Sequence, residues 1–440
     1  SNTPLSIELD GSGNIFTMCQ NASMSNLTIL KLDPSGNILW TKNLPPLGGY
    51  SMTKDISGNL LIIGSFNGTQ DFDPGAATYT ITANNVDAFI LKLDANGNFV
   101  WAKNVGGLVM ALGYKITSDG AGNVFAAGVF DGTVDFDPDA GNYFLTAIGN
   151  YDPFVLKLDA TGNFAWAIKL GGPTQEDCRG IAVDGVGNVF VCGTLQGSGD
   201  YDPGIGSFTL NTMGLEDVFV TKLNPSGNFV WAKSFGGTQV DYSYDMVTDV
   251  TGTYITGTFR SNVDFDPGAG TFTLAATGLD DVFISKVDNN GNFLWAKNFS
   301  LNNGGIPNAI YADAPGNVYT TGGFKGFGDF DPDAGTTYLT AFGTGFDAYI
   351  QKMGQAPLSV NEAYIPSNIT VYPNPTNGQL TLKLDYDAQL TITNVLGQEV
   401  LNENKTSGKQ TIDLEDQTNG IYFVKIIQAG KQYITKIIKE

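Results

Sequence analysis

Residues 91–107 read LKLDANGNFVWAKNVGG, and nearly the same string returns at residues 156–172 (LKLDATGNFAWAIKLGG) and 221–237 (TKLNPSGNFVWAKSFGG). The tryptophans of these strings belong to a series spaced 61 to 65 residues apart: Trp40, Trp101, Trp166, Trp231 and Trp295. A second marker, DFDP or DYDP, starts at Asp71, Asp135, Asp200, Asp264 and Asp329. Repetition at a fixed period is typical of folds that stack copies of one unit.

Each unit reads as β-strands throughout. In the third copy, residues 180–184 (GIAVD), 189–194 (VFVCGT), 218–223 (VFVTKL) and 229–233 (FVWAK) are short apolar or alternating runs separated by Gly-Asn turns. Glycine and asparagine suit such turns because they adopt positive φ at least cost. Four strands in a unit of about 65 residues, repeated head to tail, predict the blades of a β-propeller.

The first strand pair of the unit occurs six times, near residues 5–19, 51–66, 112–130, 179–195, 244–259 and 309–324. The sixth copy, residues 346–353, stops after its third strand and lacks the GNFVWAK partner. We therefore expect an all-β fold with a six-bladed propeller over residues 1–353, or a larger ring whose start is lost. The sixth blade is then three-stranded, completed by the segment that follows, or completed by residues upstream.

The composition excludes several classes of protein. The chain has no histidine, which excludes imidazole-based catalysis and His-ligated metal sites. Its net charge of −21 argues against nucleic acid and anionic lipid as partners. No apolar run is long enough to span a membrane. No signal peptide is visible at Ser1, which fits a mature chain or a cytosolic one.

The three cysteines lack the spacing of a metal site. Cys178 and Cys192 flank a turn at residues 184–188, so in a hairpin they would lie nearly opposite each other. The sequence leaves two interpretations open, a cross-strand disulfide or two buried thiols.

The repeat ends at Met353. Residues 354–366 carry two prolines and match no repeat, so we interpret them as a linker. Residues 367–440 contain six or seven short alternating strands, which predict a small Ig-like β-sandwich.

Both parts resemble known families. The pattern DAFILKLD…GNFVWAK…GG over residues 5–353 resembles a bacterial β-propeller repeat found in tandem in large secreted proteins. Residues 367–440 resemble the type A C-terminal sorting domain of the Bacteroidetes type IX secretion system. The matching segments are VYPNPTNGQLTL, NVLGQEV, DL…NGIYFVKI and the terminal TKIIK. The residues that carry this second resemblance are Pro373, Asn374, Pro375, Gly378, Gly397, Gly420, Tyr422 and Lys436.

The second resemblance implies a route of export. Proteins with this domain cross the inner membrane, and the domain is then recognised at the outer membrane by a translocon and its β-barrel shuttle protein. The domain is usually cleaved, and the cargo is released or attached to the cell surface. We therefore expect a secreted or surface-displayed protein that reaches the outer membrane exterior through the periplasm.

The DFDP loops are candidate calcium sites. In an extended stretch, residues i and i+2 point to one face, so two carboxylates could meet one cation, with loop carbonyls completing the shell. Aspartate followed by Pro-Gly is equally typical of a capped turn. The residues concerned are Asp71, Asp73, Asp135, Asp137, Asp200, Asp202, Asp264, Asp266, Asp329 and Asp331. No cofactor is required by either interpretation.

An active site must break the symmetry of a repeat, and few charges do so. The main off-pattern charges are Arg179, Arg260, Glu216 and the pair Glu176 and Asp177. We therefore expect a non-catalytic module that binds a protein or a glycan, or serves in adhesion. The alternative is a secreted polysaccharide-degrading enzyme that uses paired carboxylates, since these suffice for glycoside hydrolysis. The tryptophans are expected in the core rather than on a sugar-stacking surface.

Overall fold

The computed structural model describes residues 2–21, 26–45, 47–313, 316–333, 335–354, 370–394, 399–428 and 431–440. Two compact units divide the chain, Ser1–Met353 and Gly354–Glu440. No described residue lies in a helix, and the ordered segments are β-strands joined by turns.

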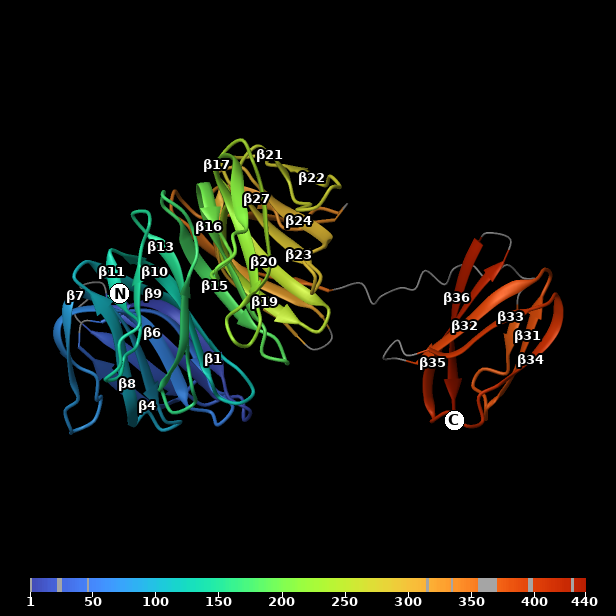
Figure 1. Cartoon of the computed structure of the whole chain (residues 1–440), viewed down its shortest axis with the longest axis horizontal. Coiled ribbons are helices and arrows are strands. Elements are labelled where there is room, and N and C mark those ends of the chain that lie inside the picture. The colour runs from blue at the N-terminus through green and yellow to red at the C-terminus, as the bar shows by residue number, and fades with distance from the viewer. Residues whose placement is uncertain are drawn as a thin grey trace. The chain divides into compact units, whose positions relative to one another are not determined.

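The first unit is a β-propeller whose blades follow one another along the chain, coloured from blue to orange in Figure 1. Strand pairing within the described residues defines six blades. Five blades contain four antiparallel strands each. These are β1(Asn2–Leu9), β2(Ile15–Asn21), β3(Leu27–Leu32), β4(Ile38–Leu44); β5(Gly48–Lys54), β6(Leu60–Asp71), β7(Thr80–Leu93), β8(Phe99–Gly107); β9(Met110–Ser118), β10(Val124–Asp131), β13(Asp152–Leu158), β14(Phe164–Lys169); β15(Asp177–Val183), β16(Val189–Asp200), β17(Thr209–Leu223), β18(Phe229–Gly237); and β19(Tyr242–Asp249), β20(Gly252–Phe259), β23(Asp281–Val287), β24(Phe293–Leu301).

The sixth blade has three strands, β25(Gly305–Ala312), β26(Val318–Phe324) and β29(Asp347–Met353). The sequence predicted that this copy would stop after its third strand, and the described residues agree. The prediction that the following linker closes the blade falls on residues 355–369, which lie outside the described residues.

Short hairpins brace neighbouring blades. They are β11(Thr133–Asp135) with β12(Phe144–Thr146), β21(Asn262–Asp264) with β22(Thr273–Ala275), and β27(Phe327–Asp329) with β28(Tyr338–Thr340). Each hairpin pairs with the fourth strand of the blade before it, through β8, β18 and β24 respectively. Each hairpin also carries the first aspartate of a DFDP loop, so these loops lie at the junctions between blades.

The blades bury their faces against one another. β23 is buried along its whole length, and Phe283 in it packs with Phe259 and Phe265 in a shared aromatic cluster. The end blades differ, because Ile7 on β1 is 66% exposed and Ile350 on β29 is 83% exposed. Because both faces of a blade are buried, the repeat is rich in Phe, Val and Leu. In the first and last blades this burial is incomplete.

The first strand of each blade lies next to the first strand of its neighbours, in the order β1, β5, β9, β15, β19, β25, so these six strands lie nearest the axis. Every one of them carries a β-bulge at the same place. The residues left out of register are Leu5, Tyr50, Tyr114, Arg179, Tyr244 and Asn308. A bulge re-aims the side chain of its extra residue and often adjoins a functional site.

The second unit is a small β-sandwich of two antiparallel sheets. One sheet contains β30(Thr370–Tyr372), β31(Gln379–Leu384) and β34(Gly408–Asp413), and the other contains β33(Glu399–Lys405), β32(Ala388–Asn394), β35(Gly420–Gln428) and β36(Lys431–Lys439). The core contains residues from both sheets, including Leu382 and Val424, each 0% exposed. Strands such as β31 alternate between buried and exposed side chains, as expected for sheets with one solvated face.

Candidate functional site

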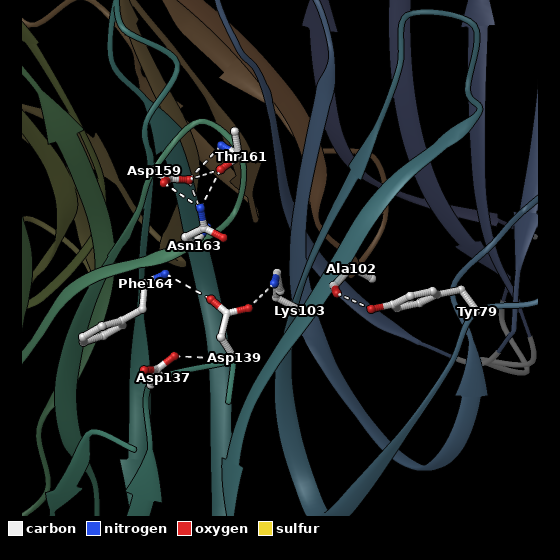
Figure 2. Close-up of polar contacts among 9 residues, drawn as sticks. All are labelled: Tyr79, Ala102, Lys103, Asp137, Asp139, Asp159, Thr161, Asn163 and Phe164. Atoms are coloured by element: carbon white, nitrogen blue, oxygen red, sulfur yellow. Dashed lines mark hydrogen bonds and ion pairs between the residues drawn. The ribbon is translucent and has the colours of Figure 1, made fainter. Parts of the chain in front are cut away.

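Turns with the pattern D-x-x-G-N recur between strands of the blades, as in residues 94–98 and 159–163. In each of these turns one aspartate carboxylate accepts the hydrogen bonds that hold the turn. Asp159 Oδ1 accepts backbone N–H groups from Thr161 at 2.8 Å and Asn163 at 3.0 Å, while Oδ2 accepts the Asn163 side-chain amide at 3.0 Å (Figure 2). Gly162 has φ of +90°, which only glycine adopts freely. Burial raises the pKa of Asp159, but these hydrogen bonds outweigh it and lower the pKa to about 2. The acidic pattern at these turns is therefore structural.

The DFDP carboxylates also accept backbone hydrogen bonds. Asp135 Oδ1 accepts N–H groups from Asp137 at 3.1 Å and Tyr143 at 2.8 Å, and Asp137 Oδ1 accepts the Asp139 N–H at 3.0 Å. Asp139 in turn pairs with Lys103 of the preceding blade (Figure 2). The other four loops repeat the first three bonds.

This arrangement is that of an Asp-capped turn. No group of three or more acidic or thiol side chains suited to a metal ion occurs within the part of the chain that the structure describes. Each loop offers two carboxylates, each with one oxygen engaged, whereas calcium takes six to eight oxygen ligands. Calcium at these loops stays a prediction.

The tryptophans take part in contacts between blades. Trp166 Nε1 and Lys157 Nζ both donate to the carbonyl of Pro225 in the next blade, each at 3.2 Å. A Cβ built on Gly227 of the same turn would lie 3.0 Å from the Trp166 ring, so the ring packs directly on this glycine. We call this contact the Lys–Trp clasp. It agrees with the expectation that the tryptophans pack internally.

Four of the five off-pattern charges lie together at the ring's centre. Two adjoining cavities of about 240 and 250 Å³ share Gln175, Glu176, Asp177 and Arg179 in their linings, and Glu216 lines the first. They lie between blades 3, 4 and 5, where the β15 bulge places Arg179. Arg260 lies apart from their linings and pairs with Asp280, with Nε 2.5 Å from Oδ1.

Aromatic rings hold the guanidinium in place. The Arg179 guanidinium carbon lies 5.6 Å from the ring centre of Tyr114 and 5.7 Å from that of Tyr244. Arg179 Nε donates to Asp177 Oδ2 at 2.5 Å. Three bulge residues of neighbouring blades thus form a Tyr–Arg–Tyr cluster, in which the guanidinium makes cation–π contacts with both rings. About half of the Arg179 side chain remains exposed to the cavity side.

Buried carboxylate oxygens accompany this cluster. Glu176 is only 2% exposed, and its Oε1 accepts the Thr174 hydroxyl at 2.8 Å. Among the described residues, Glu176 Oε2, Asp177 Oδ1 and Glu216 Oε2 are buried atoms that make no hydrogen bond of standard geometry, although the Gly172 N–H lies beside Glu176 and the Tyr242 hydroxyl beside Glu216. Burial raises the pKa of Glu176. Buried acceptors without donors are costly, so they suit a site that a ligand's donors complete.

Sequence reasoning singled out the charges of this site but missed its tyrosines. The chain has 18 tyrosines, and no feature of the sequence distinguishes Tyr114 and Tyr244 from the others. Nothing in the repeat marks the position of the bulge. Aligning the first strands by their D-x-x-G-N turns could have found them, because Tyr50, Tyr114, Arg179 and Tyr244 then share one column.

Both buried cysteines are free thiols. Cys178 pairs in register with Gly193 and Cys192 with Gly180, because the bulge at Arg179 shifts the strand between them. The interpretation as two buried thiols therefore describes the structure.

The predicted sorting residues tie the start of the second unit to its last strand. Asn374 donates through Nδ2 to the Lys436 carbonyl at 2.8 Å and accepts the Ile438 N–H at 2.9 Å. Tyr422 is buried and its hydroxyl donates to the Thr418 carbonyl at 2.6 Å. Pro373 and Pro375 follow cis peptide bonds, while Gly378 and Gly420 have positive φ. The Lys436 side chain is exposed, and Gly397 lies outside the described residues.

Comparison with protein families agrees with both units. A secretion system C-terminal sorting domain matches residues 370–440, and a β-propeller repeat family matches residues 165–194. The second unit is a type IX secretion sorting domain. This domain indicates that the protein is secreted or displayed on the cell surface. No helix long and apolar enough to span a membrane occurs among the described residues.

Curated relatives are distant. An uncharacterised WD repeat-containing protein of Acanthamoeba polyphaga mimivirus is 24% identical over 235 residues, covering 46% of this chain. The regulatory protein FlaEY of Caulobacter vibrioides is 25% identical over 167 residues, covering 37% of this chain. This chain spans only 17% of the length of each relative in these matches.

Two solved structures that the chain resembles have low TM-scores. An exo-β-1,3-galactanase from Phanerochaete chrysosporium has a TM-score of 0.29 and 9% identity, covering 98% of this chain and 94% of that one. PorZ, a surface component of the type IX system of Porphyromonas gingivalis, has a TM-score of 0.16 and 11% identity, covering 99% and 91%. Scores this low establish no shared activity.

Proposed function

We propose that the propeller of this exported cargo is a non-catalytic binding module that takes a neutral saccharide at the cavity around Arg179. On the cell surface such a module would serve adhesion. The observation that carries the proposal is the pairing, in one cavity, of buried carboxylate oxygens that make no hydrogen bond of standard geometry with a partly exposed arginine side chain.

The hydrogen-bonding needs of the site favour hydroxyl groups. Glu176, Asp177 and Glu216 offer acceptors only, while Arg179 offers donors only. A sugar hydroxyl both donates and accepts, so one ligand can satisfy both kinds of group. An ammonium group only donates, and it would be repelled by Arg179. Cavities of about 240 and 250 Å³ suit one or two sugar rings better than a long chain.

The charge of the site argues against anionic ligands. Three carboxylates line the cavities against one guanidinium, and that guanidinium is already paired with Asp177. An anion entering here would meet net negative charge in a partly buried setting, where repulsion is strong. Neutral glycans are therefore the ligand class that this site supports best.

The two arginines of the chain, Arg179 inside the cavity and Arg260 outside it, provide a test variant and its matched control. The whole protein is screened on an array of neutral oligosaccharides, and the dissociation constant of each hit is measured by calorimetry. Arg179→Ala should weaken binding about tenfold or more, as expected for a central anchoring residue. Arg260→Ala removes the other arginine, outside the cavity linings, and should bind normally. Absence of saccharide binding, or equal loss in both variants, contradicts the proposal.

The same samples test the alternative of a polysaccharide-degrading enzyme. Glu176 has a raised pKa and lies near Asp177 and Glu216, and a raised-pKa acid beside a second carboxylate is the arrangement that glycoside hydrolysis uses. Release of reducing sugar from the bound glycan at enzyme-like rates, abolished by Glu176→Gln, would establish hydrolysis and overturn the non-catalytic assignment. We expect no release above background.

We propose that the sorting domain contacts the outer-membrane translocon and its β-barrel shuttle protein through residues 367–440. The match of the domain to the sorting family supports this assignment. Deleting residues 367–440 should leave the protein unexported in a native host, with the propeller retained in the periplasm. Normal export of the truncated protein would refute it, and export of the Arg179→Ala full chain serves as the control.

A further inference from the structure

The lysine bond and the ring packing of the Lys–Trp clasp recur at four junctions between blades, whereas among the described residues only Trp166 and Trp231 also make the indole N–H bond. The third-strand lysines Lys31, Lys92, Lys157 and Lys222 donate to a carbonyl in the turn of the next blade, at 3.0 to 3.4 Å. The fourth-strand tryptophans Trp40, Trp101, Trp166 and Trp231 cover the glycine of the same turn. A Cβ built on Gly97, Gly162, Gly227 or Gly291 would lie 3.0 or 3.1 Å from the ring.

Blade 1 has the same turn without a cover. Gly36 has φ of +86°, and Asp33 accepts the Asn37 side-chain amide at 2.8 Å as in the other blades. A Cβ built on Gly36 has nothing within 4 Å. Ile38, directly after the turn, is 60% exposed. The Gly36 turn is thus formed like those that receive a tryptophan, but no described residue covers it.

Blade 6 lacks the strand that would deliver such a cover. In complete blades the third-strand lysine lies opposite the tryptophan, as Lys222 opposite Trp231 and Lys286 opposite Trp295. The corresponding strand β29 carries Lys352 at that place, and among the described residues it pairs only with β26. Its Tyr349 is buried while Ile350 is 83% exposed, so one edge and one face of this strand are unpartnered.

We infer that the β29 edge is a strand-addition site for an extended segment with the repeat's own G-N-F-x-W-A-K pattern, and that the tryptophan of this segment covers Gly36. The segment completes blade 6 through main-chain hydrogen bonds to β29, the mode of β-strand addition. Its tryptophan lies opposite Lys352, in the register of the complete blades. The junction from blade 6 to blade 1 then repeats the clasp of the other junctions and closes the ring.

Two physical terms favour this occupant over an unrelated strand. Pairing at the edge satisfies the main-chain N–H and C=O groups that an unpaired β29 exposes. The tryptophan adds aromatic burial on a glycine that leaves space for it, as at the four existing clasps. A strand without the tryptophan gains the first term only, so the affinity should depend on this side chain.

The probe is a synthetic peptide with the sequence of residues 226–237, SGNFVWAKSFGG. We expect saturable binding to the full chain by calorimetry, a raised midpoint of thermal unfolding, and slowed amide exchange in residues 347–353. A peptide with alanine in place of its tryptophan should bind about tenfold or more weakly. Two peptides N-methylated on alternate residues should differ, since only one edge of an added strand pairs with β29.

A pair of turn glycines tests the Gly36 contact. Gly36→Asn keeps the turn, because asparagine tolerates positive φ, but its side chain occupies the tryptophan's place. Gly58→Asn makes the same change at φ of +80° in a turn where a Cβ also meets nothing within 4 Å. Peptide affinity should fall about tenfold in the first variant and stay unchanged in the second. Equal affinity for both tryptophan and alanine peptides, or exchange protection away from residues 347–353, overturns the inference.

Discussion

The outer turns and the inner strands of the propeller follow opposite rules. The D-x-x-G-N turns repeat the same hydrogen bonds from blade to blade, and the turn at Asp94 reproduces that at Asp159 within about 0.2 Å. The bulges of the first strands share only their position, and the residues that occupy them range from leucine to arginine. Copied residues build the scaffold, and the positions where the copies differ define the cavity.

This contrast separates stability from binding. The clasps join neighbouring blades and the turns join neighbouring strands. Removing any one of them should therefore lower the free energy of unfolding. Arg179 lies on a scaffold that would form without it, since its pair with Asp177 is half exposed and such pairs contribute about 0–1 kcal/mol. Variants in the clasps and turns should therefore lower the free energy of unfolding, whereas variants in the cavity should change the dissociation constant of the saccharide.

The largest effect is expected at the Lys–Trp clasp. Trp166→Ala removes the ring from Gly227 and the hydrogen bond to the Pro225 carbonyl. The free energy of unfolding should fall by about 3 kcal/mol, the lower end for large aromatic truncations because the ring is partly exposed. Denaturant titration followed by circular dichroism measures this change.

Arg179→Ala is the counterpart in the same comparison. It should change the free energy of unfolding by less than about 1 kcal/mol while weakening saccharide binding about tenfold or more. Trp166→Ala, measured below its unfolding transition, should keep the dissociation constant within about twofold, because the ring lies outside the cavity linings. A reversed pattern, with Arg179 supporting the fold and Trp166 supporting binding, would break the distinction.

The second effect concerns buried carboxyls at the junction of blades 4 and 5. Burial raises the pKa of Asp241 from the ordinary 3.8 to about 7, and that of Asp217 to about 6. A carboxyl whose pKa is higher in the folded than in the unfolded chain binds its proton more tightly when folded. Its stabilising contribution is present below about pH 4 and is lost as the pH rises through about 7.

Asp241→Asn should remove the part of this dependence that Asp241 contributes and leave that of Asp217. The asparagine keeps an acceptor oxygen for the Gly237 N–H, which donates to Asp241 Oδ2 at 2.7 Å, and has no charge to bury, but it loses the acceptor for the Arg260 N–H, which donates to Oδ1 at 3.1 Å. We expect the variant to be more stable than the natural protein at pH 8 and less stable at pH 4, by about 1 kcal/mol, because of the lost acceptor for the Arg260 N–H. Unfolding midpoints across this range provide the measurement. An unchanged pH profile would show that Asp241 ionises without cost.

The repeat made the fold predictable, because four apolar runs per period leave few alternatives to a blade. Periodicity also predicted the missing fourth strand of blade 6 and the internal place of the tryptophans. The bulges could not be predicted, since a bulge depends on how two strands pair and leaves no residue type behind. Gathering Arg179 with Tyr114 and Tyr244 required the ring itself, which brings together equivalent positions of neighbouring blades that are 65 residues apart.

A smaller effect is expected within a single turn. Asn163→Ala removes the amide that donates to Asp159 Oδ2, and should cost about 1 kcal/mol. Because the pKa of Asp159 is lowered to about 2, the bond is present above about pH 4 and is lost as the pH falls toward 2. The difference between the variant and the natural protein should therefore vanish in acid. Asn96→Ala, at the exposed tip of the equivalent turn in blade 2, should have little effect at any pH.

The smallest effect separates the two interpretations of the DFDP loops. If the loops are Asp-capped turns, adding a chelator should leave the thermal midpoint unchanged, because backbone N–H groups already satisfy Asp71 and Asp135. If each loop holds calcium, chelation should lower the midpoint and added calcium should restore it, since an ion that binds only the folded state stabilises it by mass action. Five loops of the same construction would respond together, so even weak binding would be visible. We expect no shift, and a calcium-specific rise that magnesium does not reproduce would assign the loops to the ion.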